Sequence, residues 1–253
     1  MGKVIAVANQ KGGVAKTTTV VNLAASLALL GKKALVIDMD PQGNATSGYG
    51  LNRQEIQHCM YDVLIDGAPL DGVILPTAFA NVAVAPATIN LAGAEIELVA
   101  EIARESKLKK ALRHVRQRYD YILIDCPPSL GLLTLNALTA ADGLIIPVQC
   151  EYYALEGLGQ LLNTLDLVRK HLNPDLVLEG VLLTMFDART NLSIQVVDEV
   201  KEFFGNKVFA SIIPRNVRLS EAPSHGRPVQ HYDARSKGAE MYQQLAKEVV
   251  ERG

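Results

Sequence analysis

The feature that most constrains the fold is a glycine-containing turn, Lys11 to Thr18, with the sequence Lys-Gly-Gly-Val-Ala-Lys-Thr-Thr. An apolar run at 4–8 precedes it, and a helix-like run at 19–30, closed by Gly31, follows it. Strand, glycine-rich turn and helix in this order are the context that a phosphate-binding loop requires. Backbone N–H groups of such a loop point at phosphate oxygens, and the following helix adds its positive N-terminal end.

The side chains of this turn fit phosphate chemistry at most positions. Lys16 is placed to reach the terminal phosphates of a nucleotide, and the Thr17 hydroxyl is placed to bind a magnesium ion. The common pattern G-x-x-x-x-G-K-[ST] expects glycine where Gln10 and Ala15 stand. The Ala15 methyl adds bulk where backbone passes close to phosphate, so this residue is either natural and harmless, or an engineered or function-reducing substitution.

Acidic side chains follow two further apolar runs. Asp38 and Asp40 come after the run 33–37, and Asp125 ends the run 121–125. Ligands bind at the carboxyl ends of strands in open α/β sheets, so these carboxylates are candidates to hold magnesium or to orient an attacking water. A polar turn with a capping aspartate is the alternative for the first pair.

Charge and cysteine content exclude several classes of protein. The chain of 253 residues has a net charge of −2, so a nucleic-acid partner has to be met by a local basic patch. Its three cysteines, Cys59, Cys126 and Cys150, include no C-x-x-C pair, which argues against a zinc site or a disulfide framework. Cys126 invites an iron–sulfur interpretation, but a buried thiol accounts for it better. We expect no signal peptide and no membrane-spanning run.

Strands and helices are expected to alternate along the whole chain. This alternation predicts one α/β domain over residues 1–253, with a mostly parallel, twisted sheet that carries helices on both faces. The expected strands are 4–8, 33–37, 82–86, 121–125, 143–148 and 176–185. The expected helices are 19–30, 61–65, 94–103, 108–118, 132–139, a long helix that follows 149–157 and ends at 171, and 238–252.

Basic residues gather in two segments. The expected helix 108–118 contains no acid, and from 207 to 237 only Glu221 and Asp233 oppose six lysines and arginines. Either segment would support non-specific, salt-sensitive phosphate binding, or be an ordinary solvated surface. Charge alone does not decide between the two, although cations near a helix C-terminus favour the solvated face for 108–118.

Four strings together resemble ParA/Soj-type chromosome-partition ATPases of the ParA/MinD family. The first is the turn itself, with a lysine early in the loop as in the deviant phosphate loop of that family, which nevertheless expects glycine at position 15. The others are D-x-D-P-Q-G-N at 38–44, D-x-P-P-S at 125–129, and the segment 213–223. The resemblance runs nearly end to end and implies a single P-loop ATPase domain.

The resemblance implies a role for each matching residue. Lys11 would be the signature lysine that touches a second subunit's phosphates, Lys16 would bind the nucleotide's own phosphates, and Asp40 would position the attacking water. Thr17, Asp38 and Asp125 would surround magnesium. The nucleotide would contact the loop and the segment that lies against adenine, namely Lys11, Gly12, Gly13, Val14, Ala15, Lys16, Thr17, Thr18, Pro214 and Asn216. Arg189 and Arg218 match arginines implicated in binding DNA.

The implied activity is slow ATP hydrolysis with ATP and Mg²⁺ as cofactors, in a cytoplasmic, nucleoid-associated protein. The implied partners are DNA bound without sequence preference, a second copy in an ATP-dependent homodimer, a ParB-type protein that stimulates hydrolysis, and a replication initiator as a further candidate. A MinD-like membrane ATPase is disfavoured, because the tail 239–252 is not net basic. A metabolic P-loop enzyme would need a substrate constellation that the sequence does not display.

Overall fold

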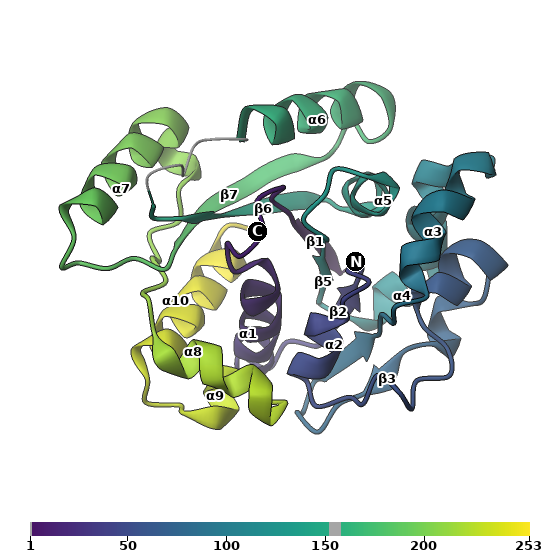
Figure 1. Cartoon of the computed structure of the whole chain (residues 1–253), viewed down its shortest axis with the longest axis horizontal. Coiled ribbons are helices and arrows are strands. Elements are labelled where there is room, and N and C mark those ends of the chain that lie inside the picture. Colours follow the sequence, from purple (N-terminus) through teal and green to yellow (C-terminus); the bar gives the residue numbers. More distant parts are fainter. Residues whose placement is uncertain (1, 152–157) are drawn as a thin grey trace.

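A seven-stranded sheet forms the centre of the computed structural model, which describes residues 2–151 and 158–253 (Figure 1). Its strand order is β3-β4-β2-β5-β1-β6-β7. Neighbouring strands pair in parallel, except that β3 runs antiparallel to β4 at the edge. The strands are β1 (Lys3–Val7), β2 (Ala34–Asp38), β3 (Leu75–Pro76), β4 (Val82–Ala85), β5 (Tyr121–Asp125), β6 (Gly143–Gln149) and β7 (Val177–Thr184).

Helices cover both faces of this sheet, as the sequence predicts (Figure 1). The α-helices are α1 (Lys16–Leu29), α2 (Asn44–Gly48), α3 (Leu91–Glu97), α4 (Lys107–Val115), α5 (Leu132–Ala140), α6 (Leu158–His171), α7 (Asn191–Phe204), α8 (Val217–Glu221), α9 (Val229–Tyr232) and α10 (Lys237–Glu251). Shorter turns are the π-helix η1 (Asp62–Asp66) and the 3-10 segments η2 (Leu70–Gly72), η3 (Leu98–Ala100), η4 (Arg104–Ser106), η5 (Arg116–Arg118), η6 (Gly205–Lys207) and η7 (Ala222–His225).

The two faces of the sheet bury separate apolar cores. Side chains alternate along a strand, so in β1 Ile5 and Val7 face one side while Val4 and Ala6 face the other. The first side packs against α1 and α10, and the second against helices that include α4, α5 and α6. Because both sides are covered, the central strands are apolar at nearly every position, which is typical of a buried parallel sheet.

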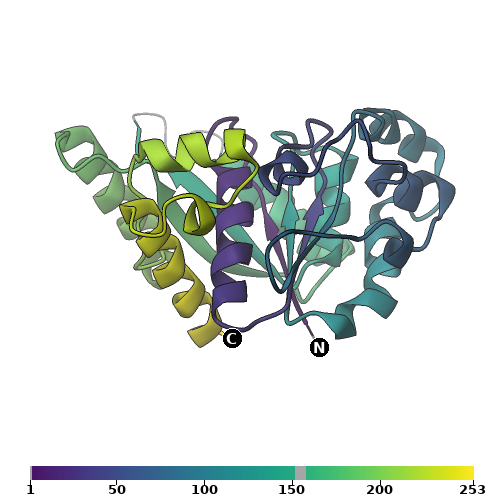
Figure 2. The ribbon, with the colours of Figure 1, turned by 90° about the horizontal axis from the view of Figure 1, so that it is seen from below.

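Because the strands are parallel, the carboxyl ends of β1, β2 and β5 lie side by side at one edge of the sheet. Asp38 at the end of β2 pairs in register with Asp125 at the end of β5, and the loop after β1 emerges beside them. Figure 2 shows this edge at the top, with both chain termini at the opposite edge. The fold therefore brings the phosphate loop and the two strand-end carboxylates together.

Some helix predictions were wrong in detail. The expected helix 94–103 is α3 followed by the short turn η3, and it ends at Ala100 because the next residue, Glu101, takes an extended conformation with φ of −81° and ψ of 139°. The expected helix 108–118 is α4, continued by the tighter η5. Helix α7 was not predicted. Of the expected lead-in at 149–157, residues 152–157 lie outside the described part, and α6 begins at Leu158.

None of the helices in residues 2–151 and 158–253 combines the length and the apolar character needed to cross a bilayer.

Candidate functional site

The turn between β1 and α1 is anchored to the strands β6 and β7. Asn9 accepts a hydrogen bond from the Lys11 backbone N–H (3.0 Å), and its side-chain amide donates to the Pro147 carbonyl (2.8 Å). The Thr184 hydroxyl donates to the Val14 carbonyl (3.2 Å). These contacts reach the loop from β6 and β7, so its shape is set by distant parts of the chain.

Two residues of the loop have left-handed backbone conformations. Gly13 has a φ of 75°, and Ala15 has a φ of 70° and a ψ of 32° at the N-cap of α1. Glycine adopts this region freely, whereas alanine pays a steric cost between its Cβ and the backbone. The structure therefore gives a backbone reason, besides the methyl's bulk, for expecting glycine at position 15.

Lys16 lies at the first turn of α1 and is 7% exposed. Its ammonium donates to the Lys11 carbonyl at 3.0 Å, across the loop. Burial lowers the pKa of Lys16, and the carboxylates of Asp125 and Asp40 act in the opposite direction. A cation held inside a loop of backbone N–H groups is suited to binding an anion.

Asp38 and Asp125 form a pair of fully buried carboxylates on adjacent strands. Burial raises the pKa of Asp38 to about 6, against hydrogen bonds from Thr46 and the Asp40 backbone that lower it. Burial also raises the pKa of Asp125 well above its usual range, and the neighbouring Asp38 adds to that rise. Two buried carboxylates placed next to each other each disfavour the ionisation of the other.

The Asp38 carboxylate is held by three hydrogen bonds. One oxygen accepts from the Thr46 backbone N–H (2.8 Å) and from the Thr46 hydroxyl (2.7 Å), and the other accepts from the Asp40 backbone N–H (3.2 Å). Asp40 is 8% exposed, and its side chain accepts from the Gln42 backbone N–H (2.9 Å). Both acids of the segment therefore have fixed orientations.

Asp125 differs, because neither of its carboxylate oxygens has a hydrogen-bond partner among the described residues. The Thr17 hydroxyl is close enough to lower the Asp125 pKa, although the contact is not a regular hydrogen bond. A buried carboxylate without partners, beside a hydroxyl and a helix N-terminus, fits a hard cation such as Mg²⁺, which prefers oxygen ligands. No group of three or more His, Cys, Asp or Glu side chains in residues 2–151 and 158–253 is arranged as a metal site, and the expected site needs only carboxylates and a hydroxyl.

A hollow of about 390 Å³ joins the loop to the last third of the chain. Ala15 and Thr18 line one side, and Pro214 and Asn216 line the other. The two predicted nucleotide segments, separated by about two hundred residues of sequence, therefore share one cavity. The Asn216 side chain also caps α8, accepting from the Arg218 backbone N–H at 2.9 Å.

The two candidate DNA-binding arginines lie on neighbouring segments after β7. A β-bridge between Phe186 and Pro214 joins these segments. Arg189 is exposed and makes an ion pair with Asp187 (2.6 Å), and Arg218 pairs with Glu221 (2.8 Å) and Asp233 (3.2 Å). The two acids noted in segment 207–237 thus both neutralise one arginine, which the sequence did not reveal.

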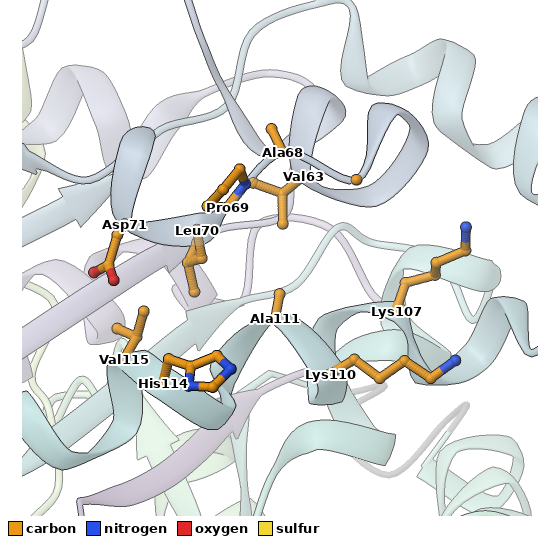
Figure 3. Close-up of a pocket in the computed structure, with 11 residues that line it drawn as sticks. Val63, Ala68, Pro69, Leu70, Asp71, Lys107, Lys110, Ala111, His114 and Val115 are labelled. Atoms are coloured by element: carbon orange, nitrogen blue, oxygen red, sulfur yellow. The ribbon is translucent and has the colours of Figure 1, made fainter.

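The basic helix α4 lies away from the phosphate loop. Lys109, Lys110 and Arg113 have no ion-pair partner among the described residues, whereas the flanking cations Lys107, Arg116 and Arg118 are paired. A hollow of about 430 Å³ lies between α4 and the turns η1 and η2. Figure 3 shows its lining side chains, with Lys107 and Lys110 at one end. None of the predicted site residues lines this hollow.

Sequence patterns did not single out several residues that position the site. Thr46 orients Asp38, as described above. In α1, the Asn22 side chain accepts from the Val229 backbone N–H (2.7 Å) and ties α1 to α9. The Tyr242 hydroxyl of α10 contacts the Thr19 hydroxyl (3.2 Å). The only sequence signal for these residues was a polar side chain on an otherwise apolar helix face. That signal does not show which residue elsewhere in the chain the side chain contacts.

Strand order, phosphate loop and paired carboxylates define a P-loop nucleotide-binding protein. The AAA_31 family, described as AAA domain, matches residues 2–178. The chain is 65% identical to the sporulation initiation inhibitor protein Soj of Bacillus subtilis over 253 residues, covering 100% of both chains. It is 56% identical to the chromosome partitioning protein ParA of Myxococcus xanthus, covering 100% of this chain and 89% of that one. The chain belongs to the ParA/Soj family of chromosome-partition P-loop ATPases.

Solved structures share this fold, and one of them contains a nucleotide analogue. One is a cobyrinic acid a,c-diamide synthase from Mycobacterium smegmatis with a bound ATP analogue and magnesium, 40% identical, with a TM-score of 0.87, covering 99% of this chain and 95% of that one. Another is the cell division ATPase MinD of Pyrococcus furiosus, 26% identical, with a TM-score of 0.82 and complete coverage of both chains. The fold thus supports binding of a nucleotide and Mg²⁺.

Proposed function

We propose that this chain is an ATP-driven switch of chromosome partition, which dimerises and binds DNA in its ATP state and is released by hydrolysis. The observation that carries the proposal is the meeting of the phosphate loop, the buried pair Asp38 and Asp125, and the hollow at Pro214 and Asn216. Membership of the family supports the role in chromosome partition, and the geometry of this site supports a response to nucleotide.

In this proposal the loop residues 11–18 hold the phosphates, and adenine lies in the hollow beside Pro214. Lys16 exchanges its contact with the Lys11 carbonyl for a phosphate oxygen, which relieves the cost of its burial. Thr17 and Asp125 hold magnesium, with Asp38 as the supporting acid. The metal neutralises charge on the terminal phosphates.

Asp40 orients the water that attacks the γ-phosphate. Its carboxylate is fixed by the Gln42 N–H and lies near Lys16, so it reaches the same edge of the sheet. Lys11 is half-buried on the loop and contacts the phosphates of a second subunit. ADP lacks the γ-phosphate, so hydrolysis weakens that contact and the dimer separates.

DNA binding is proposed for the segments that carry Arg189 and Arg218. Phosphates replace the carboxylates that now pair with these arginines, and this exchange makes binding weak in the monomer and sensitive to salt. A dimer doubles the number of such contacts on one surface. A ParB-type protein stimulates hydrolysis and so ends the bound state.

Ala15 is proposed to weaken nucleotide binding or to impair dimerisation or hydrolysis. Its methyl lines the hollow that would receive the nucleotide, and its backbone is in the left-handed region. The hydrolysis rate of this chain is then lower than that of an Ala15→Gly variant.

Binding to a DNA duplex of arbitrary sequence, measured with ATP, with ADP and without nucleotide, tests the proposal. We expect ATP-dependent binding that falls as salt rises, in this chain or, if Ala15 blocks the switch, in Ala15→Gly alone. Arg218→Ala should weaken binding to all sequences alike. An absence of binding by both forms under every condition refutes the switch and favours a metabolic enzyme, or a membrane ATPase if vesicles are bound instead.

A further inference from the structure

Thr46 stands at the junction of three elements beside the candidate magnesium site. It lies in α2, is fully buried, and directs both its backbone N–H and its hydroxyl to one oxygen of Asp38 at the end of β2. Its hydroxyl oxygen also accepts from the Ala87 backbone N–H (3.0 Å), just after β4. One side chain therefore connects α2 with the ends of two neighbouring strands.

This arrangement fixes the direction of the Thr46 hydroxyl. Because the Ala87 N–H donates to the hydroxyl oxygen, the hydroxyl proton is directed to the other neighbour, Asp38. The 2.7 Å distance to the carboxylate is that of a strong O–H to carboxylate hydrogen bond. Two donors thus hold one oxygen of Asp38 and fix the rotation of the carboxylate.

The same contacts close the loop that carries Asp40. Residues 38 to 46 begin at Asp38 and return to it through Thr46, and within this ring the Gly43 N–H donates to the Asp40 carbonyl (2.8 Å). Gly43 has a φ of 62°, and a Cβ there would lie 2.9 Å from the Ala87 carbonyl. The ring is therefore closed tightly against the end of β4, and its geometry depends on the Thr46 contacts.

We propose that Thr46 is a positioning residue for the nucleotide-bound magnesium and for hydrolysis. Its hydroxyl sets the orientation of Asp38 towards the metal and, by closing the loop, sets the place of Asp40 relative to the phosphates. The inference rests on the proposed roles of Asp38 and Asp40. Residues that orient a metal-binding carboxylate affect metal affinity even though they never touch the metal.

Three variants separate this role from a general structural one. Thr46→Val keeps the shape and removes the hydroxyl, which leaves the Ala87 N–H without its acceptor. Thr46→Ser keeps the hydroxyl. Thr139→Val in α5 is the matched control, because the Thr139 hydroxyl is equally buried and has no hydrogen-bond partner among the described residues.

The measurement is the affinity for a fluorescent ATP analogue as a function of Mg²⁺ concentration, with an arm in excess EDTA, and the unfolding temperature of each variant. We expect Thr46→Val to raise the Mg²⁺ concentration for half-maximal affinity by about 10-fold or more, with affinity in EDTA unchanged. Thr46→Ser and Thr139→Val should titrate with Mg²⁺ as the unchanged chain does, whatever their unfolding temperatures. The turnover number of Thr46→Val should fall more than its KM rises.

Several results would overturn the inference. They are an unchanged Mg²⁺ titration in Thr46→Val, an equal shift in Thr139→Val, or a shift in Thr46→Ser as large as that in Thr46→Val. If Thr46→Val does not fold, Thr46→Ala, which also removes the hydroxyl, decides in its place: it should raise the Mg²⁺ concentration for half-maximal affinity, and an unchanged titration overturns the inference. If the unchanged chain binds nucleotide without regard to Mg²⁺, the proposed magnesium site itself fails, and that outcome is distinct from failure of Thr46 alone.

Discussion

Replacing Ala15 with glycine should make the protein more stable and its nucleotide site more open. Ala15 has a φ of 70° and a ψ of 32°, where an L-residue other than glycine pays roughly 1–2 kcal/mol. Glycine loses more conformational entropy on folding than alanine does. This loss reduces the stability gained by relieving the strain by about 0.4–1 kcal/mol. We therefore expect Ala15→Gly to raise the free energy of unfolding by about 1 kcal/mol, or about 2–4 °C in Tm for a chain of this size.

Ala103 supplies a matched control for this prediction. It is an exposed alanine with a φ of 53° and a ψ of 36°, so Ala103→Gly relieves the same kind of strain far from the loop. Both variants should gain comparable stability in urea denaturation. Only Ala15→Gly should also gain ATP affinity, ATP-dependent dimerisation or hydrolysis, because only its methyl lines the hollow beside Thr18 and Pro214.

Backbone strain at position 15 and obstruction of the nucleotide by the Ala15 methyl can be tested separately. If Ala15→Gly is no more stable than the unchanged chain while Ala103→Gly is, the left-handed strain at position 15 is compensated and the backbone argument is wrong. If Ala15→Gly gains stability but binds ATP, dimerises and hydrolyses as before, the methyl does not obstruct the nucleotide. Calorimetric titration with ATP and Mg²⁺ and light scattering distinguish these cases.

Two further predictions concern the buried polar groups. The pKa of Asp38 is raised from 3.8 to about 6, so its contribution to stability is present below pH 4 and is lost as pH rises through 6. Asp38→Asn should therefore add on the order of 3 kcal/mol more stability at pH 7.5 than at pH 4 in metal-free urea denaturation, and an equal effect at both would contradict the raised pKa. Asn22→Ala leaves the buried Val229 N–H unpaired and should cost about 1–3 kcal/mol, whereas an unchanged midpoint would show that another acceptor takes its place.

Short sequence patterns were enough to predict the strands and the helix that carry the candidate nucleotide site. The strand 121–125 and the helix after the turn are as expected, because an apolar run ending in aspartate and a glycine-rich turn before a helix each have few alternatives. Helix ends were predicted less well. The expected helix 94–103 breaks at Glu101, where the backbone becomes extended, and no residue type there announces this change. Helix α7 was not predicted, although one of its faces is apolar.

Site residues on one segment could be predicted, whereas their partners could not. Lys16, Asp38 and Asp125 could be named as candidates because their types and spacing fit phosphate and magnesium chemistry, and the structure places them at one edge of the sheet. That Thr46 holds Asp38, and that the acids Glu221 and Asp233 both neutralise Arg218, depends on which side chains the folded chain brings within hydrogen-bond distance.

The sequence by itself determined the class of fold, the family and the candidate phosphate-binding residues, because strand–helix alternation and short motifs can be read from the order of residues along the chain. Only the tertiary structure decided that β2 lies beside β5, so that Asp38 and Asp125 become neighbours, and that Pro214 faces Ala15 across one hollow. The strand order depends on packing helices against both faces of the sheet at once. The packing energy comes from contacts between residues that are far apart in the chain. The positions that couple the site to the rest of the molecule therefore appear only when the whole chain is folded.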